Sequence, residues 1–310
     1  MRRFAIVLGA LALAGLAGFW FLTMPRPLSA AQLAAVGGYE PDLANGETLF
    51  WAGGCASCHA APDAEEADRL RLGGGQALET GYGAFGVPNI SPHPRSGLGA
   101  WSFADFANAM VRGVAPDGRH YYPAFPYTSY AKMPLDDLAD LWAFMKTLPA
   151  VETSGPAPET ELAFPYNVRR GIGLWKRAYL SEAPVVGNAA LGSDPQLLRG
   201  RYLTEGPGHC GECHTPRNWA GAMDTGRWLA GAPNPEGEGR VPNITPHAQG
   251  VAGWTEDDLA FGLESGFTPE FDSMGSTMAA VVKNFAQVGA EDRAAIAAYL
   301  KAIPALPDAP

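Results

Sequence analysis

The longest apolar run of the chain lies at its N-terminus, where residues 4–24 carry no charge. As a helix this run would rise about 31 Å, close to the hydrocarbon thickness of a bilayer. Arg2 and Arg3 precede it and predict a cytoplasmic N-terminus with an exported body. We interpret residues 1–29 as a single-pass inner-membrane anchor. A cleaved signal peptide is the alternative, although signals usually have only roughly 7–15 apolar residues.

Apolar positions in the body follow helical spacing. Leu138, Leu141 and Phe144 fall on one face of a predicted helix, together with Met145 and Leu148. Acidic residues at 136–137 favour the start of this helix, and a proline at 149 ends it. No stretch shows the sustained period-two alternation of a strand. The pattern therefore predicts an all-α fold, with helices separated by loops that contain many of the 38 Gly and 27 Pro.

This pattern occurs twice, at an offset of 153 to 155 residues throughout. A duplicated domain explains the constant offset, and we expect domains at residues 40–150 and 188–305 with a connector at 151–187. The matching segments are 46–49 with 200–203, 87–93 with 241–247, 99–102 with 252–255, and 136–149 with 291–304.

The net charge of −10 excludes the basic surface that nucleic-acid binding requires. The acidity belongs to both predicted domains, with 7 basic and 13 acidic residues in 40–150 and 8 basic and 15 acidic residues in 188–310. Such surfaces favour partners with basic faces.

The four cysteines form two C-x-x-C-H motifs, which are typical of c-type haem attachment. Two structural disulfides would be the simplest alternative in an exported protein, but they do not explain the histidine that follows each pair. A zinc site would need four ligands in one compact unit, and the motifs lie 155 residues apart. We therefore expect two covalently bound haem c groups, attached through Cys55, Cys58, Cys210 and Cys213, with His59 and His214 as iron ligands.

A second strong ligand would make each haem an electron carrier, and methionine suits that role. Met133 precedes the last helix of the first domain and is our candidate there. Met278 is the candidate in the second domain, with Met274 as its rival. His93 and His247 are competing ligands, but we expect them to hydrogen-bond their own loops or a propionate.

The connector carries four basic residues at positions 169, 170, 176 and 177. Four interpretations are open for these residues. They are solvated side chains of an interdomain segment, or they pair with haem propionates, contact anionic lipid, or form a surface for a partner.

The chain resembles the cytochrome c subunits of membrane-bound bacterial dehydrogenases that oxidise alcohols, aldehydes and gluconate. Both C-x-x-C-H motifs, both Pro-Asn-Ile loops, residues 121–127 leading to Met133, and residues 278–282 carry the resemblance. The family's methionine ligands match Met133 and Met278. Those subunits usually have three haem domains, whereas this sequence predicts two cytochrome c-like domains.

The resemblance implies a periplasmic electron carrier rather than an enzyme. A dehydrogenase is the expected donor, and a terminal oxidase or a soluble cytochrome is the expected acceptor. The alternatives are a dihaem peroxidase-like enzyme, which needs one open iron site, and a cytochrome subunit of a haem-copper oxidase. A thiosulfate-oxidising cytochrome would need a further cysteine ligand, and the chain has none to spare.

Overall fold

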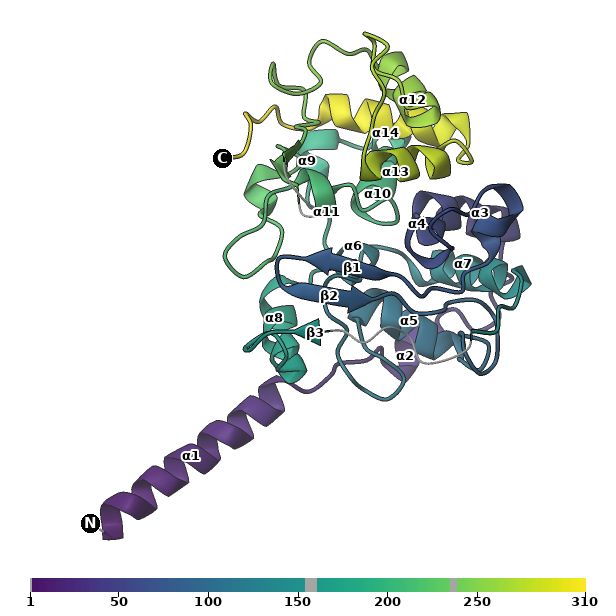
Figure 1. The fold of residues 1–310 in the computed structure, drawn as a ribbon. Coiled ribbons are helices and arrows are strands. Elements are labelled where there is room, and N and C mark those ends of the chain that lie inside the picture. The colour runs from purple at the N-terminus through teal and green to yellow at the C-terminus, as the bar shows by residue number, and fades with distance from the viewer. Residues whose placement is uncertain (1, 154–160, 235–238) are drawn as a thin grey trace.

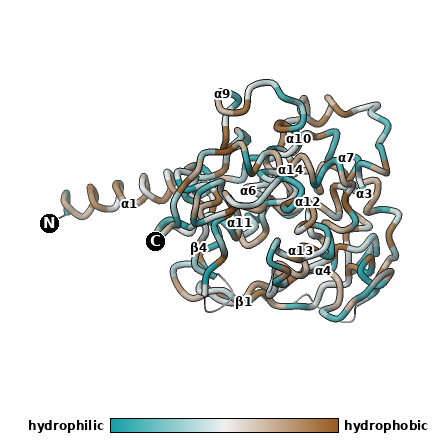
Figure 2. Tube along the Cα trace, turned by 90° about the horizontal axis from the view of Figure 1, so that it is seen from above, coloured by the Kyte–Doolittle hydropathy of each residue, from teal (hydrophilic) through white to brown (hydrophobic). Residues whose placement is uncertain are grey.

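A computed structural model describes residues 2–153, 161–234 and 239–310. Residues 154–160 of the predicted connector and residues 235–238 of the second predicted domain lie outside this part of the chain. The first helix, α1 (Arg2–Leu22), projects from the body as a separate rod (Figures 1 and 2). It is long and apolar enough to cross a membrane, and none of it is buried in the protein. The short helix α2 (Ala30–Ala34) follows it.

The same succession of elements then occurs twice, once in the lower and once in the upper part of Figure 1. The first half contains α3 (Leu43–Ala52), α4 (Cys55–His59), η1 (Glu66–Leu70), β1 (Ala77–Thr80), β2 (Gly83–Gly86), α5 (Phe103–Arg112), α6 (Tyr127–Tyr130) and α7 (Leu135–Thr147). The second half contains α10 (Pro195–Glu205), α11 (Gly211–His214), η3 (Thr225–Arg227), β4 (Ala232–Pro233), β5 (Arg240–Val241), α12 (Glu256–Ser265), α13 (Thr277–Phe285) and α14 (Ala290–Ala302).

Between the halves lie β3 (Glu161–Leu162), η2 (Arg169–Gly171), α8 (Ile172–Tyr179) and α9 (Asn188–Leu191). The start of this segment is docked on the first half, because β3 pairs with β2, which pairs with β1. Its end, α9, lies with the second half, where Arg201 donates to Asn188 at 2.6 Å. In the second half β4 pairs with β5. The expectation of a purely helical fold is therefore incomplete, and the fold is helix-rich with two small antiparallel sheets. Strands of two to four residues are too short to produce a detectable alternation.

The first and last helices of each half cross at a glycine. Gly46 of α3 lies against α7, and Gly200 of α10 lies against α14. A Cβ atom at Gly46 would lie 2.8 Å from the Cβ of Phe144, and one at Gly200 would lie 2.8 Å from the Cβ of Tyr299. The glycines thus allow the backbones to approach closely.

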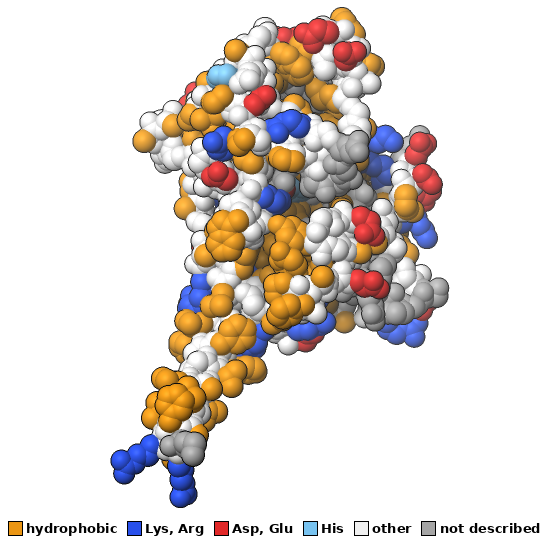
Figure 3. Space-filling model, turned by 60° about the vertical axis from the view of Figure 1, so that its left-hand side comes forward, with side chains coloured by type: hydrophobic (Ala, Val, Ile, Leu, Met, Phe, Trp, Pro, Cys, Tyr) orange, Lys and Arg blue, Asp and Glu red, His pale blue; other side chains and the backbone are white. Residues whose placement is uncertain are grey.

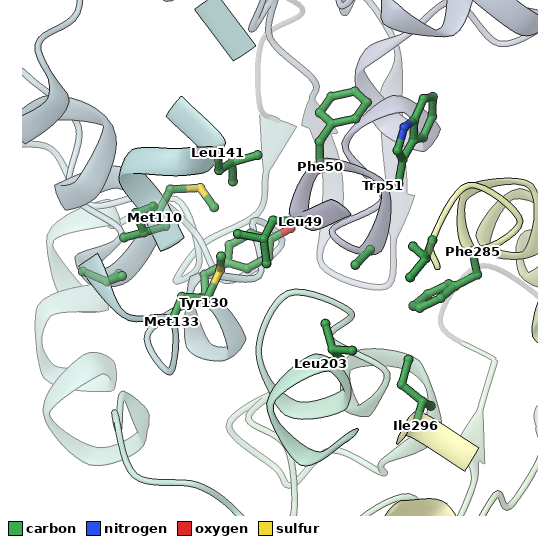
Figure 4. Close-up of a cluster of buried hydrophobic side chains, with 14 of the residues drawn as sticks. Leu49, Phe50, Trp51, Met110, Tyr130, Met133, Leu141, Leu203, Phe285 and Ile296 are labelled. Carbon is green, nitrogen blue, oxygen red and sulfur yellow. The ribbon is translucent and has the colours of Figure 1, made fainter. Parts of the chain in front are cut away.

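The middle helix of each half has matching ends. A capping box of Ser102 and Asp105 begins α5, and Gly113 ends it in the left-handed conformation. Thr255, Asp258 and Gly266 do the same for α12. Both middle helices therefore end at a glycine in the left-handed conformation. Apolar side chains from both halves form one buried cluster, part of which Figure 4 shows.

Candidate haem sites

Each C-x-x-C-H motif forms a short helical turn. Residues three apart share one face of such a turn, so the two thiols of a pair lie on the same side with the histidine directly after them. Burial raises the pKa of Cys55 to about 12, and the neighbouring Cys58 contributes in the same direction. Burial likewise raises the pKa of Cys210 to about 12. Neighbouring cations lower the pKa of thiols that serve in redox exchange, and no cation among the described residues contributes to the pKa of Cys55 or Cys210.

The two histidines are oriented by backbone carbonyls. His59 Nδ1 donates a hydrogen bond to the carbonyl of Pro88 at 2.8 Å, and His214 Nδ1 donates to that of Pro242 at 2.8 Å. Since a carbonyl only accepts, Nδ1 carries the proton and Nε2 keeps the lone pair that can bind a metal. Burial lowers the pKa of both imidazoles, although the proline carbonyls act in the opposite direction. Burial is the larger effect and favours the neutral imidazole, while the carbonyl orients the ring; a neutral, oriented imidazole is the form that ligates iron.

The Pro-Asn-Ile loops hold these carbonyls in place. Asn89 Oδ1 accepts from the Ser91 N–H at 2.8 Å, and Asn89 Nδ2 donates to the carbonyl of Val151 at 2.7 Å. In the second half Asn243 bonds Thr245 and Leu306 in the same way. The sequence shows that these loops repeat, but it does not reveal which backbone group acts on the histidine. The proline at the same place in both loops is the signal that could have identified it.

Met133 lies in the buried cluster between α6 and α7, with 5% of its surface exposed. Its N–H donates to the carbonyl of Tyr130 at 2.9 Å, and Figure 4 shows the two side chains in the same cluster. The corresponding position in the second half is Val288, which lies 155 residues later and bonds the carbonyl of Phe285 at 3.1 Å. The two predicted methionine ligands therefore do not occupy equivalent positions in the repeat.

Met278 is the second residue of α13 and is half-buried. Met274, also half-buried, packs its methyl group near Gly262 of α12, where a Cβ atom would lie 2.7 Å away. Met223 lies behind the attachment turn, since a Cβ atom at Gly211 would be 3.2 Å from its sulfur. Met274 and Met278 thus remain the methionines to be compared in the second half.

The competing histidines are engaged in their own loops. His93 Nδ1 lies 2.8 Å from Ser96 Oγ and accepts from the Ser96 N–H at 3.2 Å. His247 Nδ1 accepts from the Gln249 N–H at 3.2 Å. These contacts agree with the expectation that both histidines hydrogen-bond their loops.

Each attachment turn lies against a helix of the other half at the junction, as Figure 1 shows for α4 with α13 and for α11 with α6. Ser57, inside the first motif, accepts a hydrogen bond from Asn284 of α13 at 2.7 Å. Glu212, inside the second motif, accepts from Ser129 of α6 at 3.1 Å and from Thr128 at 2.7 Å.

These contacts are related by the repeat, since Ser57 and Ser129 correspond to Glu212 and Asn284 at an offset of 155 in both cases. The junction is therefore a pseudo-twofold interface. His209 Nε2 adds a bond to the carbonyl of Gly53 at 3.3 Å. The sequence alone gave no sign of these contacts, because each joins segments more than 80 residues apart.

The donor set in each half fits a haem c. A helical turn presents two thiols on one side, and the adjoining imidazole has its Nε2 free of the bond that fixes the ring. A buried or half-buried methionine lies in the segment before the last helix of each half.

Comparison with known proteins agrees with this geometry. The family model described as cytochrome c matches residues 43–149. A protein of Cereibacter sphaeroides described as diheme cytochrome c-type is 51% identical over 308 residues, which cover 98% of this chain and 99% of that protein. The fructose dehydrogenase cytochrome subunit of Gluconobacter japonicus is 34% identical over 91% of this chain and 55% of its own length. The cytochrome c subunit of the quinone alcohol dehydrogenase of Gluconobacter oxydans is 31% identical over 93% and 61%. The chain thus spans little more than half the length of these two dehydrogenase subunits.

Proposed function

Because the chain belongs to the family of dihaem c-type cytochromes, we propose that it is a membrane-anchored periplasmic electron carrier. It takes electrons from a dehydrogenase and passes them towards a terminal oxidase or a soluble cytochrome, while catalysis belongs to the partner. The observation that carries the proposal is the histidine geometry, which is the same in both halves.

In this proposal Cys55, Cys58, Cys210 and Cys213 attach the two haems, His59 and His214 are the proximal ligands, and Met133 and Met278 are the distal ligands. Haem iron with histidine and methionine ligands would supply reversible one-electron redox chemistry in each half. The proline carbonyls fix the rings of the imidazoles, and burial keeps the imidazoles neutral by lowering their pKa. The pseudo-twofold interface holds the two attachment turns at one separation and orientation.

The names of the relatives support a dehydrogenase as donor, because two of them are cytochrome subunits of fructose and alcohol dehydrogenases. The acidity of both halves supports partners with basic docking faces. The length and composition of α1, with Arg2 and Arg3 before it, support an anchor whose N-terminus is cytoplasmic.

Methionine-to-leucine variants test the ligands with little change in side-chain volume. We expect Met133→Leu to make one oxidised haem high-spin and to lower its reduction potential, with both haems still attached. Met110→Leu is the matched control, because Met110 is 7% exposed and packs in the same cluster. In the second half, we expect Met278→Leu to give these same changes and Met274→Leu to behave like the control.

Two results would overturn the proposal. A high-spin haem in the EPR spectrum of the oxidised wild-type protein would indicate an open iron site and a peroxidase-like enzyme. Unchanged spectra and potentials in Met133→Leu would remove Met133 as a ligand. Purification of the tagged chain from membranes tests the partner, since co-purification with a haem-copper oxidase core rather than a dehydrogenase would favour an oxidase subunit.

A further inference from the structure

We propose that the face of the body around the end of α1 is a lipid-docking surface. Residues 164–177 of the connector contact the anionic headgroup layer there and hold the first half against the bilayer in one orientation. This inference rests on the proposed membrane anchoring, and it concerns the body of the protein rather than the spanning helix itself.

The end of α1 is built into the folded body. Thr23, which directly follows α1, is completely buried, and its carbonyl accepts a hydrogen bond from His120 Nε2 at 2.8 Å. A Cβ atom at Gly173 of α8 would lie 2.6 Å from the Thr23 Cα, so α8 packs directly on this segment. The helix therefore does not leave the body through a flexible linker, and the direction of α1 fixes the orientation of the body.

Basic side chains of the connector bind the last turn of α1. Arg170 donates to the carbonyl of Trp20 at 2.9 Å, and its guanidinium lies 3.5 Å from the centre of the Trp20 ring. Arg177 donates to the carbonyl of Leu22. Cations at a helix C-terminus satisfy its unpaired carbonyls and interact favourably with its dipole. These residues thus lie at the level where a spanning helix would leave the hydrocarbon.

The same segment exposes apolar side chains beside these cations. Phe164 is 80% exposed, and Tyr166, Val168 and Leu174 are also exposed. The carbonyl of Tyr166 accepts a hydrogen bond from Tyr122 at 2.9 Å, which ties this loop to the segment that follows His120. Figure 3 shows hydrophobic side chains continuing from α1 onto the adjoining part of the body, with basic side chains next to them. Aromatic rings mixed with arginine are the composition of a membrane interface.

The positive charge of this face indicates that it binds an anionic lipid surface. The two halves are acidic, with net charges of −6 for 40–150 and −7 for 188–310, and an anionic bilayer repels them. The connector contributes Arg169, Arg170 and Arg177, and the exposed Arg26 follows α1. Basic residues next to a spanning helix are attracted to anionic headgroups. A lipid surface therefore fits this face better than a partner with a basic docking face.

Cysteine accessibility tests the proposal in the full-length protein with both haems attached, where the native cysteines are consumed by haem. Phe164→Cys and Phe271→Cys form a matched pair, because Phe164 is 80% and Phe271, in the second half, is 79% exposed. Each variant is reconstituted in vesicles of phosphatidylcholine alone or mixed with phosphatidylglycerol, and its reaction with a membrane-impermeant maleimide is followed by mass. We expect labelling at position 164 to be several-fold slower than at 271, with stronger protection in the anionic vesicles.

The outcomes separate this inference from the proposed function. A chain that does not float with the vesicles overturns the anchoring itself. If it floats and position 164 reacts as fast as position 271, the docking surface is wrong while the anchor stands. Equal protection in both lipids removes the role of anionic headgroups. Protection that appears only when a dehydrogenase is added would assign the face to a protein partner and overturn lipid docking.

Discussion

His59, the proposed proximal ligand of the first half, is held by two backbone contacts. Its Nδ1 bonds the carbonyl of Pro88, and its own carbonyl accepts a hydrogen bond from the N–H of Gly74 at 2.8 Å. Gly74 has a positive φ of 64°, and a Cβ atom there would lie 2.7 Å from the Asn89 N. Gly74 thus controls the position of the loop whose Pro88 carbonyl fixes the His59 ring.

We expect Gly74→Ala to destabilise the first half by about 3 kcal/mol, because the methyl group adds overpacking to the strain of a positive φ. The displaced Pro88 carbonyl should also loosen the imidazole, so that one oxidised haem acquires high-spin character. Thermal unfolding followed by circular dichroism, together with EPR, measures both effects.

Gly75→Ala is the control for this prediction. Gly75 also has a positive φ, of 99°, but a Cβ atom there meets no atom within 4 Å. It should cost only about 1 kcal/mol, from backbone strain alone, and should leave the spin state unchanged. Equal effects of the two substitutions would mean that the contact with the Pro88 loop is unimportant.

At the scale of elements, the crossing of α10 and α14 depends on Gly200. An alanine inside an exposed helix is worth roughly 1 kcal/mol more than glycine. Here the added methyl group would collide with the carbonyl of Ala295 and lie 2.8 Å from the Cβ of Tyr299. The backbone cannot move aside as a flexible side chain can. Packing, rather than helix propensity, therefore decides whether Gly200→Ala raises or lowers the free energy of unfolding.

Gly200→Ala should therefore destabilise the protein by about 1–3 kcal/mol despite its better helix propensity. Chemical denaturation measures the change. Gly253→Ala, where a Cβ atom meets nothing within 4 Å, should stay within about 0.5 kcal/mol of the wild type. A stabilised Gly200→Ala protein would show that α10 and α14 can move apart at no cost.

The helices most accessible to sequence reasoning were those with a complete local signal. Acidic first turns, an apolar face and a following proline predicted α7 and α14, and the structure has them at Leu135–Thr147 and Ala290–Ala302. The strands were missed because pairing of two to four residues depends on partners distant in the chain. The packing of α8 on the end of α1 was missed for the same reason.

The groups of the candidate haem sites also differ in how far the sequence predicts them. The cysteines and histidines of the proposed sites could be named from the sequence, since attachment of haem c requires them at fixed spacing in one turn. The proline carbonyls were not, because a backbone group leaves no trace in side-chain chemistry. The proposed distal methionines lie between these cases, since the position just before the last helix selected Met133, whereas the equivalent position of the second half is Val288.

At the scale of the whole molecule, the pseudo-twofold interface makes each attachment turn part of the other half's packing. The carboxylate of Glu212 accepts hydrogen bonds from two hydroxyl groups of α6, and Asn284 of α13 donates a hydrogen bond to Ser57. Hydrogen bonds to a charged acceptor contribute roughly 1.5–3 kcal/mol and neutral ones about 1 kcal/mol. The two halves should therefore unfold together, although each has its own crossing helices.

We expect wild-type holoprotein to show one calorimetric unfolding transition and the double variant Glu212→Ala/Asn284→Ala to show two, because the lost contacts couple the halves. Lys283→Ala is the control, since its side chain is exposed on α13, and the alanine keeps the backbone carbonyl that accepts a hydrogen bond from Arg69 at 3.1 Å. The control should keep the single transition. If the double variant also unfolds in one step at an unchanged temperature, the apolar cluster shared by the halves couples them, and the polar contacts serve only to set the register of the two turns.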